Sequence, residues 1–496
     1  MDGCNILKIM LRINSINKQR LKAFFTRLCL LKNSFKKKTS YIAVYAHWKK
    51  IERATEKYRY FPIKLGNKLF WVFTQHFRMK QNERNSLSVL RAIDYSSDSS
   101  YYLKRYTKCP TILNDEPQLL IDISALIKKD RATGIQRVVR SVLIQWLLNP
   151  PSGWRMQPVY ATKYDGYLYA HQYTLKLLGS DKPFLKDVPI TYKAGDIFFG
   201  LDLDQKIVIS HQNFYEHLQV MQVKTCFLVH DLLPVSMPHY FSVTTNIVHH
   251  NWLEVIARSN GLFCVSQNTA HHLNEWVIKN NVQRTNIPLI SWFHLGADLH
   301  NSLPSSGLPD DAELLLKKMQ QDISFLIVAT LESRKGHRQT LDAFELLWQN
   351  GSTVNLFLVG KTGWRMDSFI ERLKDHPQYG IHLFWINNAS DQYLQKTYDA
   401  ATCLLFPSEG EGFGLPIIEA ASYGLPVLAR DIPVFREVGS EYICYFSGHE
   451  AVDLMEAIEQ WIIRYQQGLV PDSSAMPRLT WEESAAQLLS KVLALK

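Results

Sequence analysis

Residues Phe406–Ala420 read Phe-Pro-Ser-Glu-Gly-Glu-Gly-Phe-Gly-Leu-Pro-Ile-Ile-Glu-Ala. The apolar run that leads into this segment is typical of a buried strand, and Pro416 is suited to the start of a helix. Between them, Gly410, Gly412 and Gly414 allow backbone N–H groups to face a ligand without a Cβ atom in the way. A strand, a glycine loop and a helix start are where α/β proteins bind phosphate, because unpaired N–H groups and the helix dipole both favour an anion.

Two glutamates bracket this loop, Glu411 at its start and Glu419 one turn into the expected helix. Since a carboxylate does not hold phosphate, we expect each of them to accept hydrogen bonds from hydroxyl groups, as a sugar or a ribose would offer. A diphosphate in the middle with hydroxyls at either side describes a nucleotide sugar. The alternative is a capped helix with two surface glutamates and no ligand.

The wider segment resembles the retaining glycosyltransferases of family 4, which have two Rossmann-like domains (the GT-B fold). The resemblance rests on the two glutamates, their spacing and the flanks Gly424-Leu425-Pro426-Val427, Asp431-Ile432-Pro433 and Glu437-Val438-Gly439, and it covers roughly residues 118–490. It implies an α/β fold with two domains facing across a cleft. We expect an N-terminal Rossmann-like acceptor domain at residues 117–303, a C-terminal Rossmann-like nucleotide-sugar donor domain at residues 304–475, and a helix at residues 476–496. One option is that this helix packs back on the N-terminal domain.

The charge of the chain is unevenly distributed. Residues 1–110 contain 24 Lys and Arg against 6 Asp and Glu, whereas residues 111–496 contain 32 against 40. Basic and apolar residues are mixed at residues 4–32, as in an amphipathic helix on an anionic membrane surface. We therefore predict a basic, helical extension and linker at residues 1–116 that contacts such a membrane. A helical extension packed on the body is the alternative; no module typical of nucleic-acid binding accompanies the charge, so no nucleic-acid partner is expected.

Other features of the composition bear on localisation. No run of about 18 apolar residues predicts a transmembrane helix, and the first residues lack the apolar core and cleavage site of a secretory signal. Seven cysteines without Cys-x-x-Cys pairs are typical of free thiols in a reducing compartment. We expect a cytoplasmic protein, peripheral at the inner face of the cytoplasmic membrane if the extension binds lipid.

The first domain is expected to begin with a strand at Leu119–Ile123, a loop and a helix, as in the first unit of a Rossmann-type half. Family members usually carry two adjacent glycines in this loop, facing the donor diphosphate. This chain has only Gly134, for which the resemblance implies a donor-binding role. Arg131 and Arg137 could supply positive charge there, or they are ordinary loop and helix arginines.

Further strands of the first domain are expected at residues 195–199, 206–209 and 225–229. The last of these runs into His230-Asp231-Leu232-Leu233-Pro234, and the carboxyl ends of parallel strands are where open α/β folds bind ligands. The stretch resembles a family segment in which the histidine lines the cleft near the transferred sugar and the acceptor. The resemblance implies a catalytic role for His230 and an acceptor-side role for Asp231.

The second domain is expected to open with a buried strand at Ser324–Thr330, followed by Arg334 and Lys335. Two adjacent cations at the end of a strand would neutralise the charge that builds up on a departing diphosphate. The alternative is a pair of solvated surface charges. The two cations match the phosphate-binding segment of the family, although many members place another arginine just after this strand, where this chain has Thr330.

The resemblance implies the following roles in the two domains. The catalytic group comprises Glu411, His230, Lys335 and Arg334, and the donor-binding group comprises Gly134, Arg334, Lys335, Ile386, Ser408, Gly412, Phe413, Gly414, Leu415 and Glu419. In the family the nucleobase lies against the region around Ile386, largely through backbone contacts.

Resemblance to bacterial mannosyltransferases that build surface polysaccharide such as O-antigen implies retaining transfer of mannose from GDP-mannose onto a growing surface-polysaccharide or lipid-linked glycan. Another UDP-, GDP- or dTDP-sugar, or a non-catalytic glycan- or nucleotide-binding scaffold of the same fold, are the alternatives. The triplet Asp202-Leu203-Asp204 is of the kind that holds Mg²⁺ or Mn²⁺ on a nucleotide sugar. Because it falls in the first domain, away from the glutamate loop, we expect no metal and no other cofactor.

Overall fold

The computed structural model describes residues 116–496, apart from residues 131–132, 164, 181–184, 281–287, 299–304 and 496. Nearly all of the predicted basic extension, the loop residue Arg131 and the predicted domain boundary at residue 304 lie outside the described residues.

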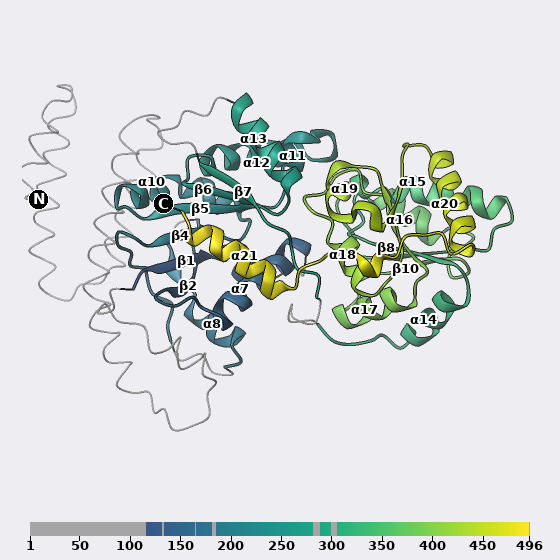
Figure 1. The fold of residues 1–496 in the computed structure, drawn as a ribbon, viewed down its shortest axis with the longest axis horizontal. Helices are drawn as coiled ribbons and strands as arrows, with labels where there is room; N and C mark the ends of the chain where they lie inside the picture. Colours follow the sequence, from purple (N-terminus) through teal and green to yellow (C-terminus); the bar gives the residue numbers. More distant parts are fainter. Residues whose placement is uncertain are drawn as a thin grey trace, which may run out of the picture. The chain divides into compact units, whose positions relative to one another are not determined.

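Two β-sheets organise this part of the chain (Figure 1). Among the described residues, the first sheet has seven strands in the order β3-β2-β1-β4-β5-β6-β7, parallel except for the β2–β3 pair. The second sheet has six strands in the order β10-β9-β8-β11-β12-β13, all parallel within the described chain. The two sheets confirm the predicted α/β fold with two Rossmann-like domains.

The strands of the first sheet are β1 (Gln118–Asp122), β2 (Arg155–Tyr160), β3 (Leu168–Tyr169), β4 (Ile197–Gly200), β5 (Lys224–Val229), β6 (Gly261–Cys264) and β7 (Leu289–Trp292). Those of the second sheet are β8 (Ser324–Val328), β9 (Asn355–Val359), β10 (Leu383–Ile386), β11 (Cys403–Phe406), β12 (Val427–Arg430) and β13 (Cys444–Phe446).

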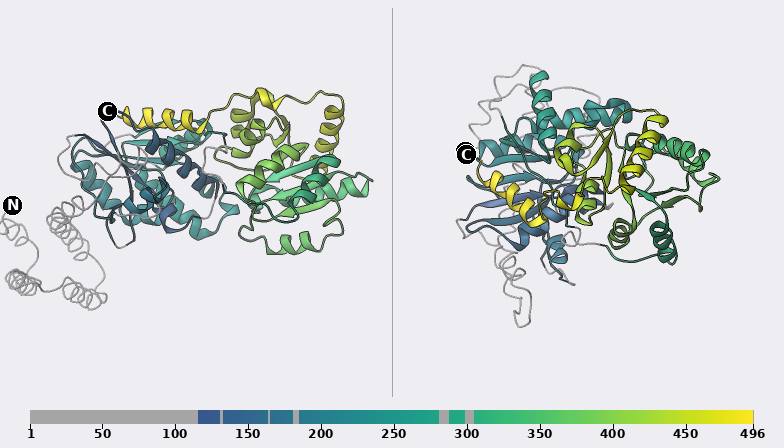
Figure 2. Two further views of the ribbon diagram at one scale, coloured as in Figure 1. Left: turned by 90° about the horizontal axis from the view of Figure 1, so that it is seen from below. Right: turned by 45° about the vertical axis from the view of Figure 1, so that its right-hand side comes forward.

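Helices alternate with these strands and lie on both faces of the sheets (Figure 2). In the first domain they are α6 (Ser124–Lys128), α7 (Gly134–Leu148), α8 (His171–Leu177), α9 (Gln205–Ser210), α10 (Gln212–Val220), α11 (Leu233–Ser236), α12 (Val243–Ile256) and α13 (Gln267–Lys279). Those that follow are α14 (Ala312–Gln321), α15 (His337–Gln349), α16 (Asp367–Lys374), α17 (Asp391–Ala400), α18 (Leu415–Ser422), α19 (Pro433–Gly439), α20 (Ala451–Gln466) and α21 (Trp481–Leu493). Because helices cover both faces, central strands such as β11 are buried along their whole length and are continuously apolar.

One predicted strand is wrong. Residues 206–209 belong to helix α9, not to a strand. The side chain of Asp204 caps this helix by accepting a hydrogen bond from the backbone N–H of Ile207 at 3.2 Å. A short apolar run fits a buried helix as well as a strand, and here the acidic cap decides between them.

The last helix, α21, packs against α7 of the first domain (Figure 1). The indole Nε1 of Trp146 in α7 donates a hydrogen bond to the carbonyl of Ala485 in α21 at 2.8 Å. Just before α21, the chain runs beside the end of the first domain, where the N–H of Ala297 donates to the carbonyl of Leu479 at 2.9 Å. Two chain segments that connect the domains are therefore hydrogen-bonded to each other.

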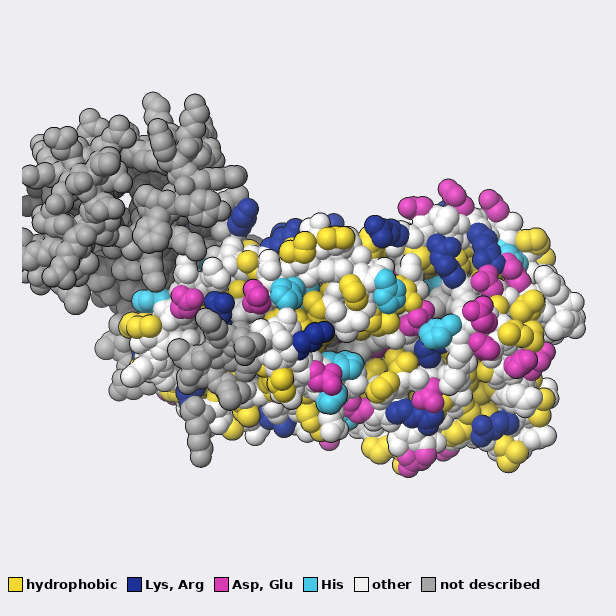
Figure 3. Space-filling model, turned by 90° about the horizontal axis from the view of Figure 1, so that it is seen from above, with side chains coloured by type: hydrophobic (Ala, Val, Ile, Leu, Met, Phe, Trp, Pro, Cys, Tyr) yellow, Lys and Arg dark blue, Asp and Glu magenta, His cyan; other side chains and the backbone are white. Residues whose placement is uncertain are grey.

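The surface drawn in Figure 3 carries basic and acidic side chains interspersed over the described part of the chain. On this face the described residues form no extended area of one sign.

Candidate active site

The glycine loop lies between β11 and α18, as predicted from the sequence. Gly414 has a φ of 107°, a left-handed conformation that favours glycine, and it is the N-cap of α18. Pro416 follows in the first turn of the helix. At Gly412 a Cβ atom would overlap the backbone carbonyl oxygen of His230, which comes directly after β5 in the first domain. The glycine therefore allows the loop of one domain to touch the strand end of the other.

The cationic pair meets the first glutamate at this loop. Arg334 and Lys335 lie in the short 3₁₀ turn Ser333–Lys335 after β8. The ammonium of Lys335 donates to Glu411 Oε1, and Arg334 Nη1 lies 3.6 Å from Glu411 Oε2. Arg334 Nη1 also donates to the carbonyl of Gly410 at 2.8 Å, and its Nη2 lies 3.2 Å from Glu332. The sequence-predicted catalytic group of the second domain is thus assembled in one place.

The charges in this cluster perturb one another. Burial raises the pKa of the Glu411 carboxyl, but the adjacent Lys335 and Arg334 charges outweigh burial and the net pKa is lowered. Burial, followed by the neighbouring Arg334, lowers the pKa of Lys335. Within the described part of the chain, the Nε atom of Arg334 is buried and has no hydrogen-bond partner. An unmet cationic donor beside a glycine loop is suited to an anion.

His230 follows β5 in the first domain, next to the glycine loop of the second. Its side chain is buried. Burial lowers the pKa of His230 to about 4, so the imidazole carries no charge at neutral pH. Its Nε2 atom is buried and, among the described residues, without a hydrogen-bond partner. Asp231 accepts a hydrogen bond from the N–H of Leu233 at 3.0 Å and so begins helix α11. The backbone carbonyl of His230 is the atom of this residue that lies against the loop, at Gly412.

The second glutamate lies deeper than a sugar-binding surface residue would. Glu419 in α18 is 2% exposed, and both of its carboxylate oxygens are engaged. Oε1 accepts from Arg137 Nη1 at 2.5 Å and Oε2 accepts from the hydroxyl of Tyr398 at 2.8 Å. Burial, followed by the Glu419 charge, raises the pKa of Tyr398 well above its ordinary value. From the sequence, Arg137 could either supply positive charge to the donor site or be an ordinary helix arginine. The sequence analysis assigned no role to Tyr398.

The remaining donor-binding candidates are distributed around the loop. Gly134 begins α7, where a Cβ atom would lie 3.9 Å from the side chain of Leu415. Ser408 is buried and its hydroxyl donates to the carbonyl of Gly410 at 3.2 Å. The ring of Phe413 packs against that of His294, with centroids 5.4 Å apart.

Ile386 lies further away in the sheet and ends β10. Its side chain is buried, and its carbonyl accepts from the N–H of Gly360 at 3.1 Å. Its side chain therefore belongs to the core, and its carbonyl is already bonded within the sheet.

A second set of contacts between the domains escaped the sequence interpretation. The carbonyl of Gly412 accepts hydrogen bonds from the hydroxyls of Ser266, at 2.6 Å, and Thr269, at 3.0 Å. Both hydroxyls come from the start of α13, where Ser266 is the N-cap. The side chain of Glu437 accepts from the N–H groups of residues 267 and 268 at 2.7 and 2.8 Å and from His294 Nε2 at 2.8 Å. The start of α13 therefore binds the glycine loop through the carbonyl of Gly412.

The candidate metal triplet has other roles. Asp202 accepts from the N–H of Leu126 at 2.6 Å, and burial raises its pKa to about 7. Asp204 caps α9 through the bond to Ile207. In the part of the chain that the structure describes, no group of three or more His, Cys, Asp or Glu side chains is arranged to hold a metal ion.

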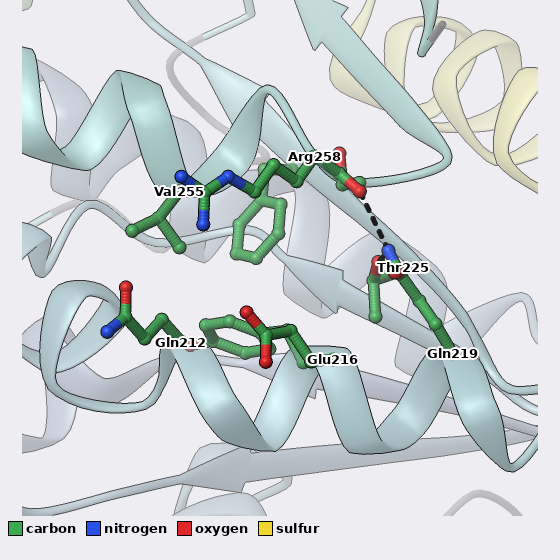
Figure 4. A pocket seen from close by; sticks show the side chains of 9 residues that line it. Gln212, Glu216, Gln219, Thr225, Val255 and Arg258 are labelled. Atoms are coloured by element: carbon green, nitrogen blue, oxygen red, sulfur yellow. Dashed lines mark hydrogen bonds between the residues drawn. The ribbon is translucent and has the colours of Figure 1, made fainter. Parts of the chain in front are cut away.

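A small pocket lies elsewhere in the first domain, between α10, α12 and β5 (Figure 4). Gln219 and Thr225 line it, and Gln219 Nε2 donates to the carbonyl of Arg258 at 2.8 Å. Thr225 lies near the amino end of β5, whereas His230 follows the carboxyl end. Because open α/β sheets bind ligands at the carboxyl ends of their strands, this pocket is not a candidate for the donor.

Comparison with known proteins agrees with this geometry. Residues 315–467, which include the cationic pair and the glycine loop, match the family described as Glycosyl transferases group 1. The chain carries a group 1 glycosyltransferase domain. Over 380 residues the chain is 42% identical to the serotype-specific mannosyltransferase WbdA of Escherichia coli, a match that covers 76% of this chain and 46% of WbdA. The chain thus spans about half the length of the curated relatives it matches.

Solved structures show the same fold. A sucrose-phosphate synthase from Thermosynechococcus elongatus matches with a TM-score of 0.53 at 15% identity, covering 77% of this chain and 100% of that structure. The Anabaena protein HepE, in complex with UDP and glucose, matches with a TM-score of 0.52 at 14% identity, covering 77% of this chain and 100% of HepE. These matches show the two-domain GT-B fold, in which the second domain contains the residues that match the group 1 glycosyltransferase family. Among the described residues, no helix is both long enough and apolar enough to span a bilayer.

Proposed function

We propose that the protein is a retaining, metal-independent glycosyltransferase that transfers mannose from GDP-mannose to a surface-polysaccharide or lipid-linked glycan acceptor. The observation that carries the proposal is the convergence of the glycine loop, Arg334, Lys335 and Glu411 directly against His230 of the other domain. The unmet Nε donor of Arg334 gives this place an affinity for an anion. The likeness to WbdA supports mannose as the transferred sugar.

In the proposed complex the diphosphate draws the two cations away from the glutamate. Arg334 and Lys335 bind phosphate oxygens together with the N–H groups near Gly412, and these donors stabilise charge that grows as the nucleoside diphosphate departs. Glu411 is then released to accept hydrogen bonds from sugar hydroxyls and to orient the anomeric carbon.

The chemical step needs no covalent bond to the protein. The bond between the anomeric carbon and the phosphate oxygen breaks, and the acceptor oxygen bonds to the same face of that carbon. The acceptor proton passes to the departing phosphate oxygen, so the products are the glycoside and the nucleoside diphosphate. His230, neutral and with an unpaired nitrogen, orients the acceptor or the sugar at this face.

Release of nucleoside diphosphate from a panel of nucleotide sugars, with and without EDTA, tests the proposal. We expect release from GDP-mannose that survives EDTA. Release from a different sugar nucleotide would correct the donor and leave the reaction class intact. Loss of activity with EDTA would favour a metal at Asp202 and Asp204, and no release from any donor would favour a binding scaffold. Membrane contact through residues 1–116 stays a prediction from the sequence.

A further inference from the structure

Arg137 of the first domain reaches two carboxylates of the second. It lies in the first turn of α7, where Thr133 is the N-cap. Its Nη1 donates to Glu419 Oε1 in α18 at 2.5 Å, and its Nη2 donates to Asp391 Oδ1 in α17 at 2.7 Å. One planar guanidinium thus binds a separate acid with each of its two terminal nitrogens, a geometry that lysine cannot reproduce.

The contact is shielded from water and continues into the second domain. The side chains of Arg137, Glu419 and Asp391 are 16%, 3% and 15% exposed. The other oxygen of Asp391 accepts from the backbone N–H and the hydroxyl of Ser305, at 2.9 and 2.8 Å. Arg137 therefore holds α17, α18 and the segment that enters the second domain from a single position in the first.

The charges of the three side chains determine how strongly this contact depends on Arg137. Burial opposes ionisation of Arg137, but Glu419 and then Asp391 outweigh it, so the pKa of Arg137 is raised. Removing the arginine would leave two partly buried carboxylates facing each other without a cation, which is far more costly than the loss of an exposed pair. The two acids would then either take up a proton or draw water into the contact between the domains.

The same contact leaves part of Glu419 available to a ligand. A carboxylate offers about four acceptor positions, and Arg137 and Tyr398 use one on each oxygen. We expect the remaining acceptor positions to receive hydrogen bonds from the hydroxyls of a ribose, because Arg137 and Tyr398 fix the orientation of the carboxylate. This step rests on the function proposed above, whereas the contact between the domains does not.

We propose that Arg137 is a positioning residue that couples recognition of the donor nucleotide to closure of the two domains. With Arg137 in place, the domains come together around a correctly oriented Glu419. Without it, the second domain loses its two hydrogen bonds to α7 and its two acids repel each other, so the contact between the domains opens and Glu419 loses its orientation.

Arg140 provides a matched control on the same helix. It lies one turn after Arg137, its side chain is 14% exposed, and its Nη1 lies 2.5 Å from Asp130 within the first domain. Arg140→Met therefore removes a largely buried arginine and an ion pair from α7 and leaves both hydrogen bonds of Arg137 in place; the charge of Arg140 contributes to the lowered pKa of Asp391 only after burial, Ser305 and Arg137. Arg137→Lys and Asp391→Asn complete the set, because the first keeps the charge and the second leaves Glu419 unchanged.

The test measures GDP affinity, donor KM and kcat, and amide hydrogen exchange of the full chain without ligand. We expect GDP affinity to fall by about tenfold in Arg137→Met, the size of one charge-assisted contact, with donor KM rising by the same factor and kcat falling less. Arg137→Lys should recover part of the loss, and Arg140→Met should stay within about twofold of wild type. Exchange in residues 409–414 should accelerate in Arg137→Met and not in Arg140→Met. Asp391→Asn should restore part of the loss in the Arg137→Met double variant, because it removes one of the two carboxylates that then repel each other.

Two outcomes would overturn the inference. Tighter GDP binding by Arg137→Met would mean that the arginine blocks Glu419. If Arg137→Met equalled Arg140→Met in both GDP affinity and hydrogen exchange, the contact would have no effect on either. If wild type binds no nucleotide, the function proposed above fails and so does the donor half of the inference. Faster exchange confined to Arg137→Met would still support the closing contact.

Discussion

At the scale of single residues, the cations expected to bind the diphosphate are paired with carboxylates in the structure. Glu411 satisfies Lys335 and approaches Arg334, while Glu332 occupies the other side of Arg334. Each cation is therefore already neutralised, and a diphosphate must outcompete a carboxylate for it. Of Glu411 and Glu332, only Glu411 belongs to the glycine loop, where the sugar is expected.

Substituting these two acids separates the roles. In Glu411→Gln the cations are freed, so GDP affinity should rise or stay the same, while transfer should fall on the order of a hundredfold, as when other single groups that stabilise a transition state are removed. Glu332→Gln is the control, with a similar effect on GDP affinity and turnover within about threefold of wild type. Calorimetry with GDP and initial rates of GDP release provide both numbers. Equal turnover in the two variants would remove Glu411 from the reaction.

At the scale of elements, the glycine loop is held between the end of β5 and the start of α13. His230 presents its carbonyl to Gly412 from one side, and Ser266 binds the Gly412 carbonyl from the other. The strand, loop and helix were predictable because glycine spacing and an apolar flank are local signals. Their partners were not, since Arg137 and Glu419 are 282 positions apart and one sequence carries no record of which distant groups meet. The error at residues 206–209 has the opposite origin, a local signal that fits two structures.

A methyl group added to this loop tests the contact. In Gly412→Ala the Cβ would overlap the backbone of another element, which cannot give way, so the loop must retract from His230. In Gly410→Ala the new atom would meet the flexible end of Met237, with Sδ at 2.5 Å. We expect Gly412→Ala to lose at least about a hundredfold in transfer, in line with small misplacements of reacting groups, and Gly410→Ala to lose far less. Initial rates and a thermal melt of each variant check this; equal rates would show that the loop tolerates retraction.

At the scale of the whole molecule, buried histidines and buried aspartates have opposite effects on how the free energy of unfolding changes with pH. Burial lowers the pKa of His230 and of His337 to about 4, and it raises the pKa of Asp122 to about 6 and of Asp202 to about 7. As pH falls from 6.5 toward 4, the unfolded chain takes up protons on the histidines, which destabilises the fold. Over the same range the folded chain takes up protons on the two aspartates, which stabilises it.

The opposite trends of these four groups largely cancel. Burial also lowers the pKa values of His171 and His249, so the free energy of unfolding of wild type should fall between pH 6.5 and 4.5. Asp202→Asn removes one stabilising proton, so its stability should fall more steeply than that of wild type as pH is lowered, whereas His337→Gln removes one destabilising proton and its stability should fall less steeply. Denaturant titrations at several pH values measure the slopes. Parallel curves for all three proteins would show that these groups do not titrate as their burial requires.

The pairing of Ala297 with Leu479 also bears on how the halves can move. The polypeptide passes between the domains twice, once in each direction, and the two passages are bonded side by side. A double tether of this kind permits bending about the tether and resists swivelling. A proteolytic cut in the first passage would therefore leave the lobes without a covalent link and α21 held on α7 by non-covalent packing, whereas a cut in the second would leave them covalently linked through the first.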